Sequence, residues 1–215
     1  MSAAPAHFDL AAITLAVLAG GEGVRMGGPK SLLTIGERPI LAYLLDRLAW
    51  PGPTLLVTAP ATPASPGAER FDRHAVDAVG GNGPLQGVRT TLENATTDVS
   101  IILTVDMPGV GQSALAWIAG ELLRRPDQLG LMCRRGPEDD LIEPFPLAIR
   151  RAALPAVAER LDAGRRSVHG LRDGSHFLAV TAPHDLPAET WTNLNHPEEL
   201  AAFRNNAGRR EPDRP

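Results

Sequence analysis

Three continuous apolar runs mark the first half of the chain, at residues 13–18, 54–58 and 100–105. Continuous hydrophobicity, as opposed to alternation, is typical of parallel strands that are buried on both faces. We therefore predict a buried strand over each run, and a shorter strand at 74–76.

Helical segments separate these strands. Leucine and isoleucine recur at helical spacing over 39–49 and again over 112–124, and a further helix is expected at about 85–95, after a glycine-rich loop. Strand, loop and helix thus alternate along the chain, which is typical of a parallel sheet with crossover helices. The pattern predicts an α/β fold built on a mostly parallel sheet.

The second half of the chain has a weaker pattern, in which an apolar run at 141–149 is broken by Pro144 and Pro146. The other expected elements are strands at 129–133 and 177–181, helices at 150–163 and 167–172, and a last helix that begins near Pro197.

Length and composition bound the number of domains. A chain of 215 residues is long enough for one sizeable domain, which we expect over 13–204. The ends, at 1–12 and 205–215, are predicted to be disordered, and the second of them is rich in asparagine, arginine and proline.

Charge and cysteine content exclude several classes of protein. The net charge of −4 and the pI of about 5.9 give no electrostatic basis for binding nucleic acid. The one cysteine, Cys133, excludes an internal disulfide, and also a zinc ribbon or iron–sulfur cluster held by one chain. No apolar run approaches the roughly 20 residues of a transmembrane helix, and no signal peptide is recognisable. A cytoplasmic protein without a membrane or nucleic-acid partner is therefore expected.

The most informative stretch is the loop after the first strand. It reads Leu18-Ala19-Gly20-Gly21-Glu22-Gly23-Val24-Arg25-Met26-Gly27-Gly28-Pro29-Lys30. Glycines such as Gly20 and Gly21 let another group approach the main chain, and successive N–H groups in such a loop form an anion-binding concavity. Arg25 and Lys30 add donors that suit phosphate. Since ligands of open α/β sheets bind at the carboxyl ends of strands, the stretch predicts a phosphate cradle. The alternative is a glycine-rich surface turn with solvated charges.

Two better-known glycine motifs are excluded here. A P-loop requires G-x-x-x-x-G-K-[ST], but Pro29 stands between Gly28 and Lys30 and removes an N–H donor. A dinucleotide fingerprint requires G-x-G-x-x-G, and Met26 occupies the place of its third glycine.

Two aspartates follow predicted strands at the same edge of the sheet. Asp106 follows 100–105 and precedes a Met-Pro pair, while Asp77 follows 74–76. One carboxylate that faces a phosphate cradle is enough to recruit Mg²⁺, because this ion takes one or two carboxylates plus substrate phosphates. The alternative for Asp106 is the cap of a turn. Three roles stay open for Asp77: a metal ligand through water, a contact to a base or ribose, or the end of a strand.

A second glycine-rich loop, residues 80–88, includes Gly83, Pro84 and Leu85. Its glycines permit the close approach of a planar base, so the loop is a candidate wall of a nucleoside pocket. A plain connecting loop is the alternative.

Four residues late in the chain are candidates for binding a second substrate. Arg165 and Arg166 suit a phosphate, or else form a solvated basic face. Asn193 and Asn195 share one side of an extended segment, where Asn195 is alternatively the cap of the last helix.

Taken together, these motifs resemble those of the molybdenum cofactor guanylyltransferases, within the MobA-like nucleotidyltransferases. The first loop is similar to the L-A-G-G…R-M-G-G-x-K signature, residues 83–88 to the G-P-L-A-G loop, and residues 105–108 to the D-x-P metal motif. Residues 165–168 and 193–200 resemble the late R-S-V and N-x-N-T-P-E-E-L segments. The first motif is shared with cytidylyltransferases and sugar-phosphate nucleotidyltransferases, whereas the combination is more specific to the guanylyltransferase branch.

The resemblance implies a single three-layer α/β/α domain with a Rossmann-like, GT-A-like nucleotidyltransferase fold. It also implies transfer of GMP from GTP to the molybdopterin phosphate, with Mg²⁺ as cofactor and pyrophosphate as product. The resemblance implies that Leu18, Ala19, Gly20, Lys30, Asp77 and Asp106 bind the nucleotide, and that Asp106 also binds the metal. From the chemistry of the two glycine-rich loops we add Gly21, Gly83, Pro84 and Leu85 as nucleotide-binding candidates. From their charges we expect Arg25, Lys30 and Asp106 to be catalytic, and Arg165, Arg166, Asn193 and Asn195 are the candidates for binding the acceptor.

This sequence departs from the family's pattern at two places. Gln86 replaces the usual small residue of the G-P-L-A-G loop, which bears on base choice, and residues 141–146 follow the acceptor segment only loosely. The expected partners are GTP and molybdopterin as substrates, with transient contacts to molybdoenzymes or other cofactor-synthesis proteins. The alternatives are nucleotidyl transfer with CTP or to a sugar phosphate, and a non-catalytic guanine-nucleotide-binding adaptor.

Overall fold

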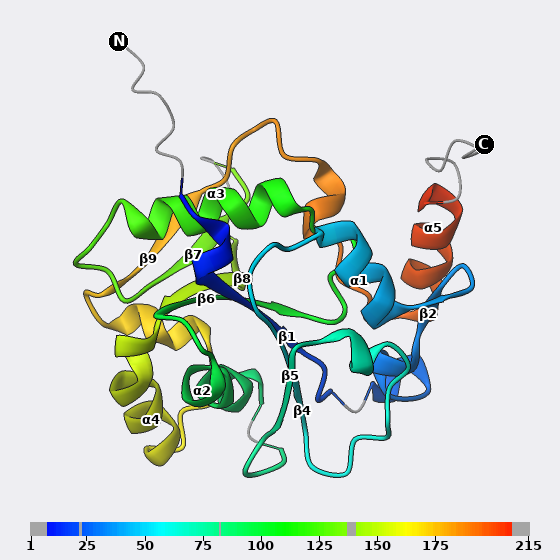
Figure 1. The fold of residues 1–215 in the computed structure, drawn as a ribbon, viewed down its shortest axis with the longest axis horizontal. Helices are drawn as coiled ribbons and strands as arrows, with labels where there is room; N and C mark the ends of the chain where they lie inside the picture. Colours follow the sequence, from blue (N-terminus) through cyan, green and yellow to red (C-terminus); the bar gives the residue numbers. More distant parts are fainter. Residues whose placement is uncertain (1–7, 22, 82, 137–140, 208–215) are drawn as a thin grey trace.

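The computed structural model describes residues 8–207 except 22, 82 and 137–140, and it contains a seven-stranded sheet in the order β5-β4-β1-β6-β8-β7-β9 (Figure 1). The strands of this sheet are β1 (Ile13–Leu18), β4 (Thr54–Thr58), β5 (Arg73–Val76), β6 (Val99–Thr104), β7 (Gly130–Arg134), β8 (Ile142–Arg150) and β9 (Phe177–Thr181). A separate small hairpin is formed by β2 (Thr34–Ile35) and β3 (Arg38–Pro39).

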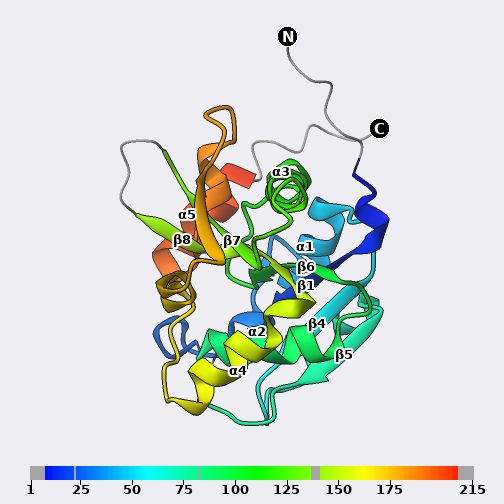
Figure 2. The same ribbon diagram turned by 90° about the vertical axis from the view of Figure 1, so that its left-hand side faces the viewer.

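Helices cover both faces of the sheet. Helices α1 and α3 lie above it in Figure 1, and α2 and α4 lie below it. Figure 2 shows the same three layers from the side, with α3 seen end-on over the sheet. The helices are α1 (Ile40–Leu48), α2 (Pro84–Asn94), α3 (Gln112–Leu123), α4 (Leu154–Asp162) and α5 (Pro197–Ala207). The predicted three-layer α/β/α fold is confirmed.

The pairing of the strands explains the hydrophobic pattern. Strand β1 pairs in parallel with β4 and β6, β4 with β5, and β7 with β9, while β8 runs antiparallel between β6 and β7. All six residues of β1 are buried, because layers of helices cover both of its faces. The prediction of a mostly parallel sheet is therefore confirmed.

The proline-containing run forms a strand despite its two prolines. Strand β8 pairs with β6 only from Leu147 onward, and its pairing with β7 shifts register between Leu131 and Cys133. Pro144 and Pro146 fall in this irregular stretch, between the β8 residues that pair with β7. A proline lacks the N–H that a regular ladder needs, and a bulge removes that need.

Regular structure extends slightly beyond both expected ends of the domain in the described residues. Residues 10–12 form a 3-10 turn, because the carboxylate of Asp9 accepts a hydrogen bond from the N–H of Ala11 at 3.0 Å. Helix α5 continues to Ala207, with Phe203 packed edge-on against Tyr43 of α1. Positions 1–7 and 208–215 lie outside the described residues, so the predicted disorder there stays a prediction.

Two predicted helices differ in kind or extent. The segment expected as one helix over 150–163 has a 3-10 turn, Arg151–Ala153, before α4. The segment expected at 167–172 is a 3-10 helix, His169–Asp173. Short connecting pieces often adopt this tighter form.

Candidate active site

The carboxyl ends of β1, β4, β5 and β6 meet at one edge of the sheet, because these strands are parallel. Gly20 and Gly21 follow β1, Asp77 follows β5 and Asp106 follows β6. Helix α5 and the first glycine loop lie on this same side, at the right in Figure 1. The predicted site residues of the first half of the chain therefore share one edge.

The side chain of Lys30 contacts two side chains from distant parts of the chain, those of Asp106 and Asn195. Its Nζ atom lies 2.5 Å from Oδ2 of Asp106 and donates to Oδ1 of Asn195 at 2.9 Å. Oδ1 of Asp106 accepts a hydrogen bond from the hydroxyl of Thr104 at 2.5 Å. The side chains of Lys30 and Asp106 are only 15% and 17% exposed, so water screens their attraction less than it would on the surface. Lys30 is also the only lysine in the 215-residue sequence.

The start of α5 positions Asn195. The carboxylate of Glu199 accepts hydrogen bonds from the backbone N–H groups of Asn195 and His196, at 2.5 and 2.9 Å. These two bonds hold the pKa of Glu199 below its usual range. The N–H of Leu194 donates to the carbonyl of Asp106 at 2.8 Å, which ties the segment to the end of β6. The backbone around Asn195 is thus fixed from two directions.

The first glycine loop folds on itself around Gly23. This residue has a φ of 60°, and its carbonyl accepts hydrogen bonds from the N–H groups of Met26 and Gly28. A Cβ atom at Gly23 would lie 1.9 Å from the carbonyl oxygen of Gly28, so only glycine fits there. Arg25 is exposed in the 3-10 turn Val24–Met26 and has no hydrogen-bond or ion-pair partner among the described residues.

Two adjacent glycines of this loop have different roles. A Cβ atom at Gly20 would lie 2.6 Å from the backbone nitrogen of Ala59. Its two chain neighbours aside, a Cβ atom at Gly21 would meet none of the described residues within 4 Å. Gly20 is therefore needed for packing against the segment after β4. Gly21 leaves open space beside the main chain.

We expect Gly21→Ala to weaken triphosphate binding about tenfold, or about 1.4 kcal/mol, because its methyl group touches only an approaching ligand. The thermal midpoint should stay that of the parent protein. Gly174→Ala is the matched control, since Gly174 is exposed, has a φ of −100° and has space for a Cβ atom. Titration calorimetry with a nucleoside triphosphate measures the effect, and unchanged binding would remove Gly21 from the cradle. Gly20→Ala should instead lower the thermal midpoint.

Helix α2, which begins in the second glycine-rich segment, packs against the end of β1. A Cβ atom at Gly87 would lie 3.0 Å from the side chain of Leu18, so this glycine lets α2 pack closely on the end of β1. Leu85 is fully buried, whereas Gly83 and Pro84 are exposed at the start of α2. Leu85 and Leu18 are therefore core residues, and any contact they make with a ligand involves mainly their backbone.

Asp77 lies at the far end of this edge, two strands away from β1. Its Oδ1 atom accepts a hydrogen bond from the hydroxyl of Thr90 in α2 at 2.6 Å. Burial raises the pKa of Asp77, because the charged form is partly desolvated, and the Thr90 hydrogen bond opposes that rise.

The four residues expected to bind an acceptor do not form one cluster of hydrogen bonds. Arg166 donates to the carbonyl of Gly81 at 3.2 Å, and the side chain of Arg165 is exposed. Asn193 donates to the carbonyl of Trp191 at 3.4 Å, while Asn195 bonds Lys30. The structure thus brings Arg166 to the second glycine loop and Asn195 to the Lys30–Asp106 pair.

Sequence reasoning missed Thr90, Thr104 and Glu199, which hold the aspartates and Asn195 in place. For Glu199 a signal was present, because a glutamate three residues after the residue that precedes a helix, here His196, is typical of a capping box. Thr90 and Thr104 gave no signal, since a threonine inside a helix or strand has no distinguishing pattern.

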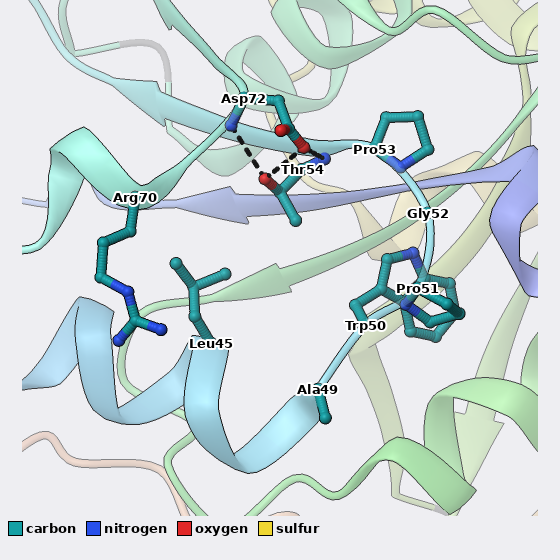
Figure 3. A pocket seen from close by; sticks show the side chains of 9 residues that line it. All are labelled: Leu45, Ala49, Trp50, Pro51, Gly52, Pro53, Thr54, Arg70 and Asp72. Carbon is teal, nitrogen blue, oxygen red and sulfur yellow. Dashed lines mark hydrogen bonds between the residues drawn. The ribbon is translucent and has the colours of Figure 1, made fainter.

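A hollow of about 730 Å³ lies away from these residues (Figure 3). It is lined by Leu45, Trp50 and Asp72 among others, at the amino ends of β4 and β5. Oδ2 of Asp72 accepts hydrogen bonds from the N–H and hydroxyl groups of Thr54, both at 2.8 Å, as Figure 3 shows. The carboxylate of Asp72 therefore holds the first residue of β4 in place. The hollow lies at the edge of the sheet opposite to Asp106.

The donor set at Asp106 suits a hard divalent cation that substrate phosphates help to bind. Among the described residues, no group of three or more histidine, cysteine, aspartate or glutamate side chains is arranged to hold a metal. A single carboxylate fits Mg²⁺, which keeps water and phosphate ligands in such sites. None of the helices in the described part of the chain has the length and hydrophobicity to span a membrane.

Comparison with known proteins agrees with this geometry. Residues 15–177 match the model of the family described as MobA-like NTP transferase domain. The chain is 29% identical over 189 residues to the molybdenum cofactor guanylyltransferase of Vibrio cholerae, covering 87% of this chain and 89% of that protein.

Two solved structures share the fold. Molybdopterin-guanine dinucleotide biosynthesis protein A from Archaeoglobus fulgidus superposes with a TM-score of 0.78 at 19% identity, covering 91% of this chain and 99% of that one. The 2-C-methyl-D-erythritol 4-phosphate cytidylyltransferase of Thermus thermophilus gives 0.65 at 19% identity, with 91% and 98% covered. The fold therefore occurs in a protein named for molybdopterin-guanine dinucleotide biosynthesis and in a cytidylyltransferase.

Proposed function

The chain belongs to the MobA-like NTP transferase family, and from this premise we propose that it transfers GMP from GTP to the phosphate of molybdopterin-bound molybdenum cofactor, with release of pyrophosphate. The observation that carries the proposal is the pairing of Lys30 with Asp106 beside the first glycine loop. A cation, a carboxylate and an open cradle at one strand edge are the parts that phosphoryl chemistry needs.

The nucleotide is expected to lie along the carboxyl edge of the sheet. The strand order β5-β4-β1-β6 places Asp77 three strand spacings from Asp106, or roughly 14 Å. The triphosphate then lies at Gly20, Gly21 and Lys30, and the nucleoside extends toward Asp77. The exposed Gly83 and Pro84 line that end.

The chain's own residues bind and orient the triphosphate. The acceptor is a phosphate, already an anion, so its in-line attack on the α-phosphorus needs no general base. N–H groups of the glycine loop, Arg25 and Lys30 hold the triphosphate and neutralise its charge, and Asn195 keeps the Lys30 ammonium in place. Arg165, Arg166 and Asn193 are the proposed contacts to the acceptor.

Asp106 is the residue that would hold a metal ion. Membership of the family indicates use of a divalent cation, and we propose Mg²⁺ at Asp106. When bound, Mg²⁺ supplies positive charge to the oxygens of the triphosphate. The expected transient contacts with molybdoenzymes and the cytoplasmic location stay predictions.

The test is pyrophosphate release by the purified protein with Mg²⁺ and each of GTP, CTP, ATP and UTP, with and without molybdenum-loaded molybdopterin. The proposal expects release only with GTP and the cofactor together. Release with CTP or another triphosphate would keep the chemistry and change the nucleotide. Binding of GTP without release for any pair would favour a non-catalytic adaptor.

A further inference from the structure

The carboxylate of Asp77 is fixed on one side and open on the other. The N–H of Asp77 donates to the carbonyl of Thr58 at 2.8 Å, just beyond the ladder of β4 and β5. The Oδ1 atom accepts from the Thr90 hydroxyl, whereas Oδ2 has no hydrogen-bond partner in the part of the chain that the structure describes. Asp77 is half-buried, so Oδ2 is an acceptor that is left for water or a ligand.

The hydroxyl of Thr90 is directed unusually for a helix. A threonine inside a helix commonly donates back to the carbonyl four residues earlier, and its neighbour Thr91 does so, to Gly87 at 2.8 Å. Thr90 is also buried, but its hydroxyl donates to Asp77, at the end of β5. The two threonines therefore have the same local structure and different functions for their hydroxyl groups.

The residue one turn before Thr90 completes the arrangement. Gln86 is 4% exposed, and its Nε2 atom lies 3.5 Å from the Thr90 oxygen, a long hydrogen bond. The Gln86 amide donates to a lone pair of the Thr90 hydroxyl oxygen. The hydroxyl hydrogen of Thr90 is then available to donate to Asp77. This gives a role to the one residue of the G-P-L-Q-G loop that is larger than expected.

We propose that Thr90 is a positioning residue for base selection, which holds the Asp77 carboxylate toward the Watson–Crick edge of guanine. Guanine presents two adjacent donors, N1–H and the exocyclic amino group, and a carboxylate has the lone pairs to accept both. The other bases present one donor beside an acceptor. The inference rests on the proposed function, because it takes the nucleoside to lie at Asp77.

The experiment compares the binding of GTP and inosine triphosphate, which lacks the exocyclic amino group. Both affinities are measured calorimetrically without the acceptor, in the full chain. We expect the parent protein to prefer GTP about tenfold, and Thr90→Val to reduce this preference to about twofold. Thr91→Val is the matched control and should keep the parent preference. Thr90→Ser should restore it, since it restores the hydroxyl.

Two results would overturn the inference. One is a parent preference for GTP that survives in Thr90→Val, and the other is equal binding of both nucleotides by the parent protein. If Thr90→Val does not fold, Thr90→Ala takes its place. Failure of the proposed function gives a different result. In that case no pair of substrates releases pyrophosphate, although Thr90→Val still changes the ratio of the affinities for GTP and inosine triphosphate.

Discussion

Replacing Asp106 by asparagine is expected to lower kcat by about 10²–10³-fold, or about 3–4 kcal/mol of transition-state stabilisation. Asparagine has almost the same shape and can still accept from the Thr104 hydroxyl, so the fold should persist. What is lost is the negative charge that pairs with Lys30 and that a divalent cation needs. Pyrophosphate release across a range of Mg²⁺ concentrations measures the effect.

The matched control is Asp98→Asn, at the other end of the same strand. Asp98 is exposed and directly precedes β6, so its carboxylate is on the edge of the sheet opposite to Asp106. We expect this variant to keep the parent rate. A near-normal rate for Asp106→Asn, with the thermal midpoint unchanged, would contradict the assignment of the metal to Asp106.

Lys30→Met is expected to lower kcat/KM about 100-fold, or about 2.7 kcal/mol. Methionine keeps much of the aliphatic length of the lysine but removes the charge that we place on the triphosphate. It also leaves Oδ2 of Asp106 and Oδ1 of Asn195 without their common donor. Triphosphate affinity from calorimetry and single-turnover rates separate the loss in binding from the loss in chemistry.

Lys30→Arg serves as the comparison for this variant. Arginine keeps the positive charge, but its planar fork does not reproduce the compact ammonium that Asp106 and Asn195 share. We expect partial activity, between that of Lys30→Met and the parent. Equal kinetics for all three proteins would exclude Lys30 from the site.

The sequence contained enough information to predict the strands and helices that build the edge of the sheet. The continuous apolar run of β1 and the aspartate after β6 are local patterns. The first glycine loop directly follows β1, and its last residue, Lys30, contacts Asp106. The strand β8 was harder to predict. Its prolines argue against pairing, and only the partner strands show that they fall at a bulge.

The contacts that organise the site could not be predicted, because they join residues far apart in sequence. Lys30 and Asn195 are separated by 165 residues, and the sequence alone favoured a helix cap or an acceptor contact for Asn195. A packing contact at Gly20 was missed for a similar reason. A Cβ atom there would meet Ala59, from the segment after β4, while the place of Gly20 in the phosphate cradle stays a prediction.

Because the sequence has a single lysine, covalent labelling of lysine side chains reports on this site alone. An acylating reagent has one side-chain amine to modify, and that amine is shared between Asp106 and Asn195 with its side chain only 15% exposed. The rate at which one acyl group is added to the peptide carrying Lys30, followed by mass spectrometry, therefore reports on the ion pair itself. A bound triphosphate that contacts the same ammonium group would slow its acylation. The acylation rate of Lys30 therefore measures nucleotide binding without any substitution in the chain.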